Sequence, residues 1–208
     1  MMTPGTTRRH FIFGLPAAAA AVALSPRAIA APVVEPAAAK LIASAEAQIG
    51  VTTLYDASYQ RLTFPGGDVA ADRGVCTDVV VRAYRVAFGF DLQQRLNADM
   101  RAHGSVYPKR WGLTRPDPNI DHRRVPNLQT FFTRHGAERP RPATEAEWQP
   151  GDLVTLMVPV GRPHIGIISA TPNAGGTRLM LVHNIGRGTQ VEDVLDQFPV
   201  TGRYRFLP

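Results

Sequence analysis

Hydrophobic positions in the first half of the chain recur at helical spacing. Four of them follow one another at intervals of four, four and three residues: Val75, Val79, Ala83 and Val86. This is the pattern of a helix that buries one face. Gly89 then stands where a left-handed C-terminal residue is favoured. We therefore predict a helix that starts around Cys76, buries these four side chains and ends before Gly89.

Three further helices are predicted from the same kind of pattern. The first covers residues 37–49 and is closed by Gly50, the second starts at Asp91, and the third runs from residue 126 or 127 to a stop at Gly136. Between the last two, residues 103–127 contain four prolines, which disfavour regular structure. This segment is predicted to be irregular.

The last third of the chain changes to short apolar runs. These runs occupy residues 153–158, 165–168 and 179–182, and residues 173–176 between them have turn composition. Residues 204–206 are a weaker candidate for a closing strand. Such runs are typical of antiparallel strands joined by hairpins. Helices followed by a sheet, without an internal repeat, predict a single α+β domain.

The N-terminus has the composition of an export signal. A basic start with Arg8 and Arg9 precedes Phe11, an alanine-rich run and a small-residue box that ends at Ala30. This order predicts a twin-arginine signal peptide cleaved after Ala30. The apolar run is too short for a spanning helix, and no cysteine at the junction supports a lipid anchor. We divide the chain into a signal peptide (1–30), a tether (31–36) and one domain (37–208), and expect a periplasmic or secreted monomer without a stable membrane anchor.

Charge gives no support for a nucleic-acid partner. The full chain has 23 basic and 17 acidic residues, and removal of residues 1–30 takes away three arginines and no acid, leaving 20 against 17, a net charge of +3. No basic run accompanies this small excess. The mature chain is also long enough to bury a substantial core.

Cys76 is the only cysteine in the sequence. The predicted helix places it in the first turn, where free backbone N–H groups and the helix dipole favour a thiolate. Exported proteins usually pair their cysteines, so a solitary one suggests that its reactivity is used. The alternative is a buried cysteine that acts only as a small hydrophobic residue. We interpret Cys76 as a candidate nucleophile.

Two histidines flank the predicted strands and can serve such a nucleophile. His164 begins one strand and His183 ends the next, so a hairpin can bring both rings to one edge of the sheet. A cysteine nucleophile needs a base, and the base needs a third group that orients it. We assign His164 as the base. Either His183 or Asn184 can orient it, but adjacent strand residues face opposite ways, so only one of them points inward.

A polar cluster in the proline-rich segment is a candidate substrate-binding loop. Its members lie between residues 117 and 127, and the strongest candidates are Asp121, His122, Arg123 and Arg124. Arginine suits carboxylate ligands, and Asp78, next to the cysteine, is a further candidate contact. Alternatively the acids cap the following helix and the arginines form surface ion pairs. His103 and His135 are interpreted as surface or helix-end residues.

A zinc site is the main rival chemistry. Cys76, His164 and His183 are acceptable ligands, with Asp121 or His122 as a fourth. No Cys-x-x-Cys or His-Glu-x-x-His spacing supports this reading, and no glycine pattern typical of phosphate binding opens a helix. We therefore expect neither a metal nor a cofactor.

The order of several motifs resembles a known enzyme family. Cys76 at a helix start is followed by Gly151-Asp152-Leu153-Val154, then His164-Ile165-Gly166-Ile167, then His183. This order is similar to the NlpC-like branch of the papain-fold cysteine peptidases, whose members mostly cut bacterial cell-wall peptides. The resemblance implies a papain-like core and an oxyanion-binding tyrosine upstream of the cysteine, for which Tyr59 or Tyr55 is available.

A closer resemblance covers almost the whole mature chain. It rests on Gly74-Val75-Cys76-Thr77-Asp78, Tyr107-Pro108-Lys109-Arg110-Trp111-Gly112, residues 119–127 and His183-Asn184-Ile185-Gly186. These motifs resemble an exported bacterial family known as domain of unknown function number 1287. Together the two resemblances give the hypothesis of an exported cysteine hydrolase that cleaves an amide bond in peptidoglycan stem peptides through a Cys-His-His thioester mechanism. An acyltransferase or transpeptidase on the same fold, or a non-catalytic cell-wall-binding module, remains an alternative.

Overall fold

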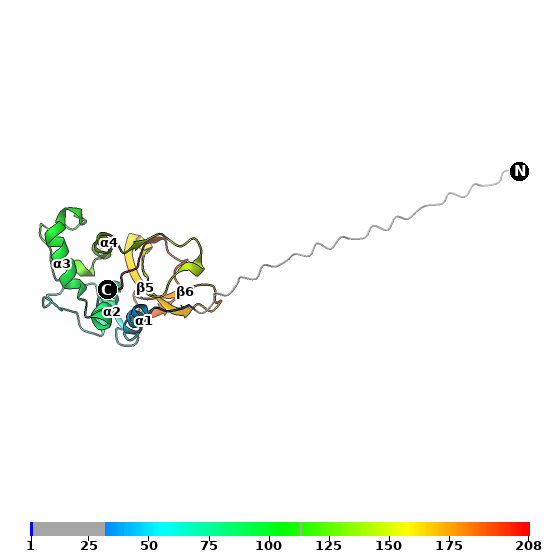
Figure 1. Cartoon of the computed structure of the whole chain (residues 1–208), viewed down its shortest axis with the longest axis horizontal. Coiled ribbons are helices and arrows are strands. Elements are labelled where there is room, and N and C mark those ends of the chain that lie inside the picture. The colour runs from blue at the N-terminus through cyan, green and yellow to red at the C-terminus, as the bar shows by residue number, and fades with distance from the viewer. Residues whose placement is uncertain (2–31, 113) are drawn as a thin grey trace.

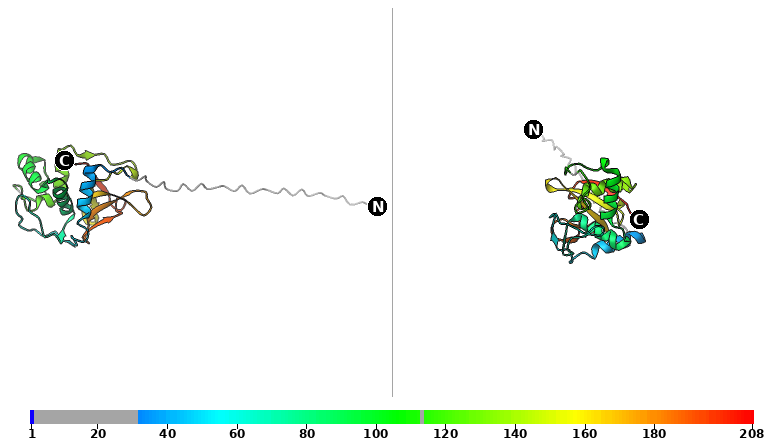
Figure 2. Two further views of the ribbon diagram at one scale, coloured as in Figure 1. Left: turned by 60° about the horizontal axis from the view of Figure 1, so that its bottom comes forward. Right: turned by 90° about the vertical axis from the view of Figure 1, so that its left-hand side faces the viewer.

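The computed structural model describes residue 1, residues 32–112 and residues 114–208, and these form a mixed α+β fold. The export features predicted for residues 6–31 therefore lie outside the described residues. In Figures 1 and 2 the helices α2, α3 and α4 gather on one side of the molecule, and the sheet that contains β5 and β6 lies on the other. The predicted fold class, α+β, is confirmed.

Four α-helices form close to the predicted positions. They are α1 (Pro36–Glu46), α2 (Cys76–Phe88), α3 (Leu92–His103) and α4 (Val125–Arg134). Short 3-10 turns occupy Gly104–Val106, Asp121–Arg123, Glu145–Glu147 and Pro159–Gly161. Helix α1 ends earlier than predicted, and Ile49 in the following turns is 45% exposed. Its last turn was therefore predicted wrongly.

Helix α2 buries a different stripe from the predicted one. Val79 and Ala83 are fully buried as expected, but Val86 is 74% exposed, and Val80 and Tyr84 are buried in its place. The reason is that α2 packs against both α1 and β5, so its buried face is broad and centred away from Val86. Gly89 ends the helix with a φ of 63°, as predicted.

Six strands form one antiparallel sheet in the order β3-β8-β4-β5-β6-β7. Their bounds are β3 (Glu138–Arg139), β4 (Leu153–Val158), β5 (Arg162–Pro172), β6 (Leu179–Asn184), β7 (Thr189–Glu192) and β8 (Val200–Tyr204). Two further short strands, β1 (Leu54–Tyr55) and β2 (Arg73–Gly74), pair in parallel. The three predicted apolar runs lie in β4, β5 and β6, whereas β3 and β7 were not predicted and β8 begins before the predicted closing strand.

The sheet separates two hydrophobic clusters. Ile165, Ile167 and Val182 face the helices α1, α2 and α4, while Ile168 and Leu181 face Trp148 and the segment after β7. Alternation along the strands explains this division, because successive side chains point to opposite faces. The start of α2 is thereby held against the first residues of β5.

The residues predicted to be a tether contribute to packing before α1 begins. The Glu35 carboxylate lies 2.7 Å from Arg205, whose guanidinium also contacts the fully buried Asp152 at 3.0 Å. The domain boundary therefore falls slightly before the predicted residue 37. No helix among the described residues has the length and hydrophobicity needed to cross a membrane.

Candidate functional site

Cys76 is the first residue of α2, and two contacts fix its backbone. The Asp78 carboxylate accepts a hydrogen bond of 2.7 Å from the N–H of Val75, the N-cap residue. On the other side, the Asn184 amide donates to the carbonyl of Gly74 at 3.1 Å. Because these contacts come from the helix itself and from β6, the helix start is tied to the sheet. The Cys76 side chain is only 4% exposed.

Burial sets the protonation state of this thiol. Removal from water raises the pKa of Cys76 to about 12, although the backbone N–H groups of Ile165, Thr77 and Cys76 act in the opposite direction. The sequence led us to expect a thiolate stabilised by the helix N-terminus. That expectation was wrong, because the effect of desolvation on the pKa is larger than the opposite effect of the helix dipole and the N–H groups. The resting group is therefore a neutral thiol.

His164 and His183 are joined directly. The Nε2 atom of His164 lies 2.7 Å from Nδ1 of His183, and both rings are buried. Since Ile167 pairs with Val182, His183 lies opposite Gly166, two residues along β5 from His164 and on the same face. The structure thus brings the two histidines together as predicted. Asn184 points away and bonds Gly74, so it does not contact His164.

A carboxylate that the sequence analysis did not identify extends this pair. Oε2 of Glu192 lies 3.1 Å from Nε2 of His183, and its other oxygen lies 2.7 Å from Arg187. The contact with His183 is close enough for an ion pair but is not aligned as a straight hydrogen bond. Glu192 was missed because β7 is a short, largely polar strand. The pairing of β7 with β6 puts Glu192 opposite Leu181, and so in a diagonal position to His183.

These contacts favour one arrangement of protons. A carboxylate can only accept, so Nε2 of His183 carries the proton that faces Glu192, and Nδ1 of His183 is an acceptor. Nε2 of His164 must then carry the proton that it donates to His183. This leaves Nδ1 of His164 with a free lone pair. Burial lowers the pKa of His164 to about 3, so this ring is neutral and a weak base at rest.

Cys76 opens into a cavity of about 280 Å³, called here the Cys76 cavity. His164 lines a neighbouring cavity of about 330 Å³, and the two share the walls Tyr55, Arg162 and Pro163. The Cys76 sulfur lies beside the N–H of Ile165, the residue after His164. Among the described residues no hydrogen bond joins the sulfur to either imidazole. The sulfur therefore contacts the backbone of β5 beside His164, and the imidazole of His164 lines the adjoining cavity.

Tyr55, and not Tyr59, is the tyrosine at this cavity. Tyr55 is the last residue of β1 and pairs with Gly74 of β2. Burial raises the pKa of its hydroxyl to about 12, so it remains a donor. The Tyr59 hydroxyl instead contacts Asp117 and Asn119, each at 3.0 Å, and Tyr59 does not line the Cys76 cavity. Of the two tyrosines considered for the oxyanion, only Tyr55 therefore lies at the Cys76 cavity.

Asp78 and Arg123, both predicted to contact substrate, instead bind each other. Their carboxylate and guanidinium lie 3.0 Å apart, with side chains only 3% and 2% exposed. Arg123 also donates to the carbonyls of Asp56 and Ser58 at 2.7 and 2.9 Å. Arg123 thus links Asp78, in the first turn of α2, to the backbone of residues 56–58. Both assignments as substrate contacts were wrong.

Among the remaining loop candidates, only Arg124 lines the Cys76 cavity. Asp121 is occupied by Arg124 at 2.9 Å and by the N–H of Asp117 at 2.6 Å. His122 is buried, which lowers its pKa to about 4, and it lines neither cavity. The predicted role of His122 in substrate binding was therefore wrong. The Asp121 carboxylate binds the Arg124 guanidinium and so orients it. Arg124 stacks over the Trp111 ring at 4.2 Å and lines the Cys76 cavity.

The residues considered for zinc do not gather into one cluster. In the part of the chain that the structure describes, no three histidine, cysteine or acidic side chains are arranged to hold a metal ion. The ring atoms of His164 and His183 face each other at hydrogen-bonding distance. His103 is exposed, and His135 bonds the Phe131 carbonyl near the end of α4, as predicted for both.

Two comparisons place the chain among known proteins. Residues 42–206 match the family described as "Domain of unknown function (DUF1287)". The chain is also 48% identical over 163 residues to "Uncharacterized protein YijF" of Escherichia coli (strain K12), an alignment that covers 78% of each protein. The family match includes every residue of the site described above, from Tyr55 to Glu192. The chain therefore belongs to the DUF1287 family.

Proposed function

We propose that this protein is an exported cysteine hydrolase that cleaves an amide bond in peptidoglycan stem peptides. The observation that carries the proposal is the chain of contacts from His164 through His183 to Glu192, which begins on the strand whose backbone contacts the buried thiol. A thiol, a neutral imidazole with a free lone pair, and two groups that orient that imidazole are the components of nucleophilic amide cleavage.

In the first step the Cys76 sulfur attacks the carbonyl carbon of the amide. The thiol proton passes to Nδ1 of His164 as the sulfur–carbon bond forms, so no separate thiolate is needed in the resting site. His164 then gives this proton to the leaving nitrogen as the carbon–nitrogen bond breaks. The products are a free amine and a thioester on Cys76.

In the second step water releases the acyl group. His164 takes a proton from a water molecule, which attacks the thioester carbonyl, and the sulfur leaves and recovers the proton from His164. The product is a carboxylic acid. In both steps His164 carries a positive charge transiently, and the Glu192 carboxylate stabilises that charge through His183.

The negative oxygen of each tetrahedral intermediate needs donors. The Cys76 backbone N–H lies at the start of α2, where backbone donors have no partner within the helix. The protonated Tyr55 hydroxyl belongs to the same cavity. We assign these two groups to the oxyanion.

The type of substrate follows from the resemblance and from the cavity walls. A cysteine at a helix start packed on an antiparallel sheet that carries the histidine is the arrangement expected of a papain-like, NlpC-like core. Among the described residues that line the Cys76 cavity there is no acid; Arg123 is neutralised by Asp78 and Arg124 is paired with Asp121. Arg110 and Arg162 line the same cavity and have no ion-pair partner among the described residues. This lining favours a substrate with carboxylates, such as a stem peptide, over a cationic or apolar one.

Digestion of purified peptidoglycan sacculi tests the proposal. Incubation with the mature protein should release soluble fragments whose masses, measured by mass spectrometry, identify the bond that is cut. Cys76→Ala should release nothing while keeping its circular dichroism spectrum. Full release by Cys76→Ala would contradict the mechanism.

The same experiment separates the alternatives. With an added amine, fragments that carry the amine in place of water would indicate an acyltransferase or transpeptidase that uses the same thioester. Binding of the native protein to sacculi without any change in fragment masses would indicate a non-catalytic cell-wall-binding module.

A further inference from the structure

A second cavity of about 350 Å³ adjoins the Cys76 cavity and has no role in the mechanism above. Its walls come from the end of α3, from residues 104–111 and 114–116, and from the turn that precedes α4. Trp111 and Arg124, which stack on each other, line both cavities. We call the second one the arginine cavity. Its volume is at the lower end of those typical of small-molecule sites.

The lining of the arginine cavity is strongly basic. Four cationic side chains contribute to it, namely Arg101, Lys109, Arg115 and Arg124, against a single acid, Asp121. That acid is already engaged by Arg124 and by the Asp117 N–H. The cavity thus has no free carboxylate to balance its remaining cations, and like charges gathered in this way favour an anionic ligand.

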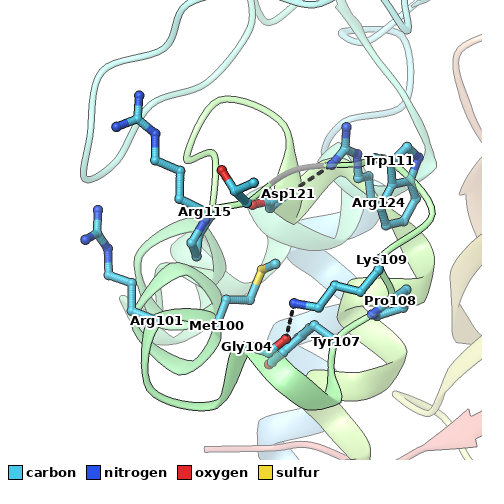
Figure 3. Close-up of a pocket in the computed structure, with 12 residues that line it drawn as sticks. Met100, Arg101, Gly104, Tyr107, Pro108, Lys109, Trp111, Arg115, Asp121 and Arg124 are labelled. Carbon is cyan, nitrogen blue, oxygen red and sulfur yellow. Dashed lines mark hydrogen bonds and ion pairs between the residues drawn. The ribbon is translucent and has the colours of Figure 1, made fainter.

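Two of these cations are free to bind such a ligand. Arg101 uses only Nε, which donates to Asn97, and Arg115 has no ion-pair partner among the described residues. Figure 3 shows both guanidinium groups at one side of the cavity, extending away from Met100 and from the opposite wall of Trp111 and Arg124. Two exposed planar forks on one side suit bidentate binding of carboxylates.

We propose that the arginine cavity is a binding subsite for carboxylates of a peptide whose scissile amide lies at Cys76. This inference rests on the proposed function and adds to it a preference for free carboxylates at a distance from the bond that is cut. Arg101 and Arg115 bind the carboxylates, Lys109 adds positive charge, and Trp111 forms a flat wall between the subsite and the reaction centre.

Binding to the inactive Cys76→Ala protein tests the subsite without requiring turnover. The probes are a synthetic stem tetrapeptide with free carboxylates, the same peptide with its side-chain and terminal carboxylates converted to carboxamides, and inorganic phosphate. Calorimetric titration should give at least roughly tenfold tighter binding of the acid form than of the amide form. In Cys76→Ala carrying also Arg101→Gln and Arg115→Gln, this ratio should fall to about twofold or less.

Matched measurements make the outcome decisive. Arg141→Gln changes an exposed arginine outside both cavities and should leave the ratio unchanged. Equal binding of acid and amide, an acid preference that survives loss of Arg101 and Arg115, or tighter binding of phosphate than of the peptide would each overturn the subsite.

Failure of the subsite is distinguishable from failure of the proposed function. Cleavage of acid and amide peptides at equal rates by the native protein would overturn the subsite and leave the hydrolase intact. Carboxylate-dependent binding that requires both arginines, without cleavage by the native protein, would support the subsite and overturn the hydrolase.

Discussion

At the scale of single residues, the central feature is a thiol and an imidazole that are both neutral at rest. Burial raises the pKa of Cys76 and lowers that of His164, so each group keeps its uncharged form over a wide pH range. Charge therefore develops only when the proton moves during attack. The contact from Glu192 to His183 then becomes important, since it favours positive charge on the histidine pair.

Replacement of Glu192 tests this electrostatic role. Glu192→Gln keeps the shape of the side chain and removes its charge, so we expect kcat on sacculus fragments to fall about tenfold with little change in KM. Burial lowers the pKa of His183 and the Glu192 carboxylate offsets part of this effect, so loss of the carboxylate should also move the acid limb of the pH–rate profile to lower pH.

The matched control for that variant is Arg187→Gln. Arg187 contacts the other oxygen of Glu192 and is 74% exposed, so its loss should change kcat less than about twofold. An unchanged kcat and pH profile in Glu192→Gln would show that the carboxylate only supports β7.

The protonation state of Cys76 predicts a particular pH dependence of alkylation. A thiol with a pKa of about 12 exposes little thiolate near neutrality, so the rate of reaction with iodoacetamide should rise steadily from pH 6 to pH 10. Trapping rates measured by mass spectrometry across this range check the expectation. A plateau reached below pH 8 would mean a preformed thiolate and contradict the neutral pair.

At the scale of elements, the start of α2 is held by contacts that come from distant parts of the chain. Asp78 caps the helix, and Arg123 from the turn before α4 neutralises that carboxylate while binding the carbonyls of Asp56 and Ser58. The buried ion pair therefore connects three segments around Cys76. Loss of one partner would leave the other charge buried and unpaired.

Arg123→Met should therefore lower the free energy of unfolding by about 3 kcal/mol, as measured by urea denaturation. The control is Arg61→Met, an exposed arginine close in sequence to residues 56–58, for which a change within about 0.5 kcal/mol is expected. A similarly small change in Arg123→Met would show that the pair is not important for stability.

The helix spacing and the short apolar runs were sufficient to predict most of the elements that bear the site. They placed Cys76 at a helix start, and His164 and His183 on neighbouring strands, because local periodicity reflects burial on one face. The predicted buried face of α2 was partly wrong, because the exposure of Val86 depends on how α1 and β5 pack against the helix. Periodicity within α2 does not contain that information.

The remaining errors concern contacts between residues far apart in sequence. Tyr59 is drawn away from the cavity by Asp117 and Asn119, which lie 58 and 60 positions along the chain. Glu192 lies in a polar strand of four residues, too short for a clear alternation. The shift of the Cys76 pKa depends on complete burial, which no local pattern specifies.

At the scale of the whole molecule, a weakly charged chain concentrates positive charge along one pair of adjoining cavities. The Cys76 cavity and the arginine cavity share Trp111 and Arg124, and the only acid in either lining is Asp121. This distribution indicates an anionic substrate that extends from the thiol toward Arg101 and Arg115. A chain with a modest net charge can therefore have a strong positive potential at these two cavities.

Salt should weaken this attraction. Raising the ionic strength from about 0.01 to 0.15 M shortens the screening length from about 30 to 8 Å, so KM for an acidic peptide should rise several-fold while kcat remains constant. The amidated peptide should respond little. Equal responses of the two peptides would argue against electrostatic recognition.

The central claim is that Cys76 carries the acyl group during turnover. Mixing the native protein with its peptide substrate and quenching in acid within milliseconds to seconds should give a protein mass increased by the acyl fragment, mapped to the peptide that contains Cys76. His164→Ala should accumulate no such adduct on this timescale. Release of product without any adduct on Cys76, together with turnover by Cys76→Ala, would contradict the account.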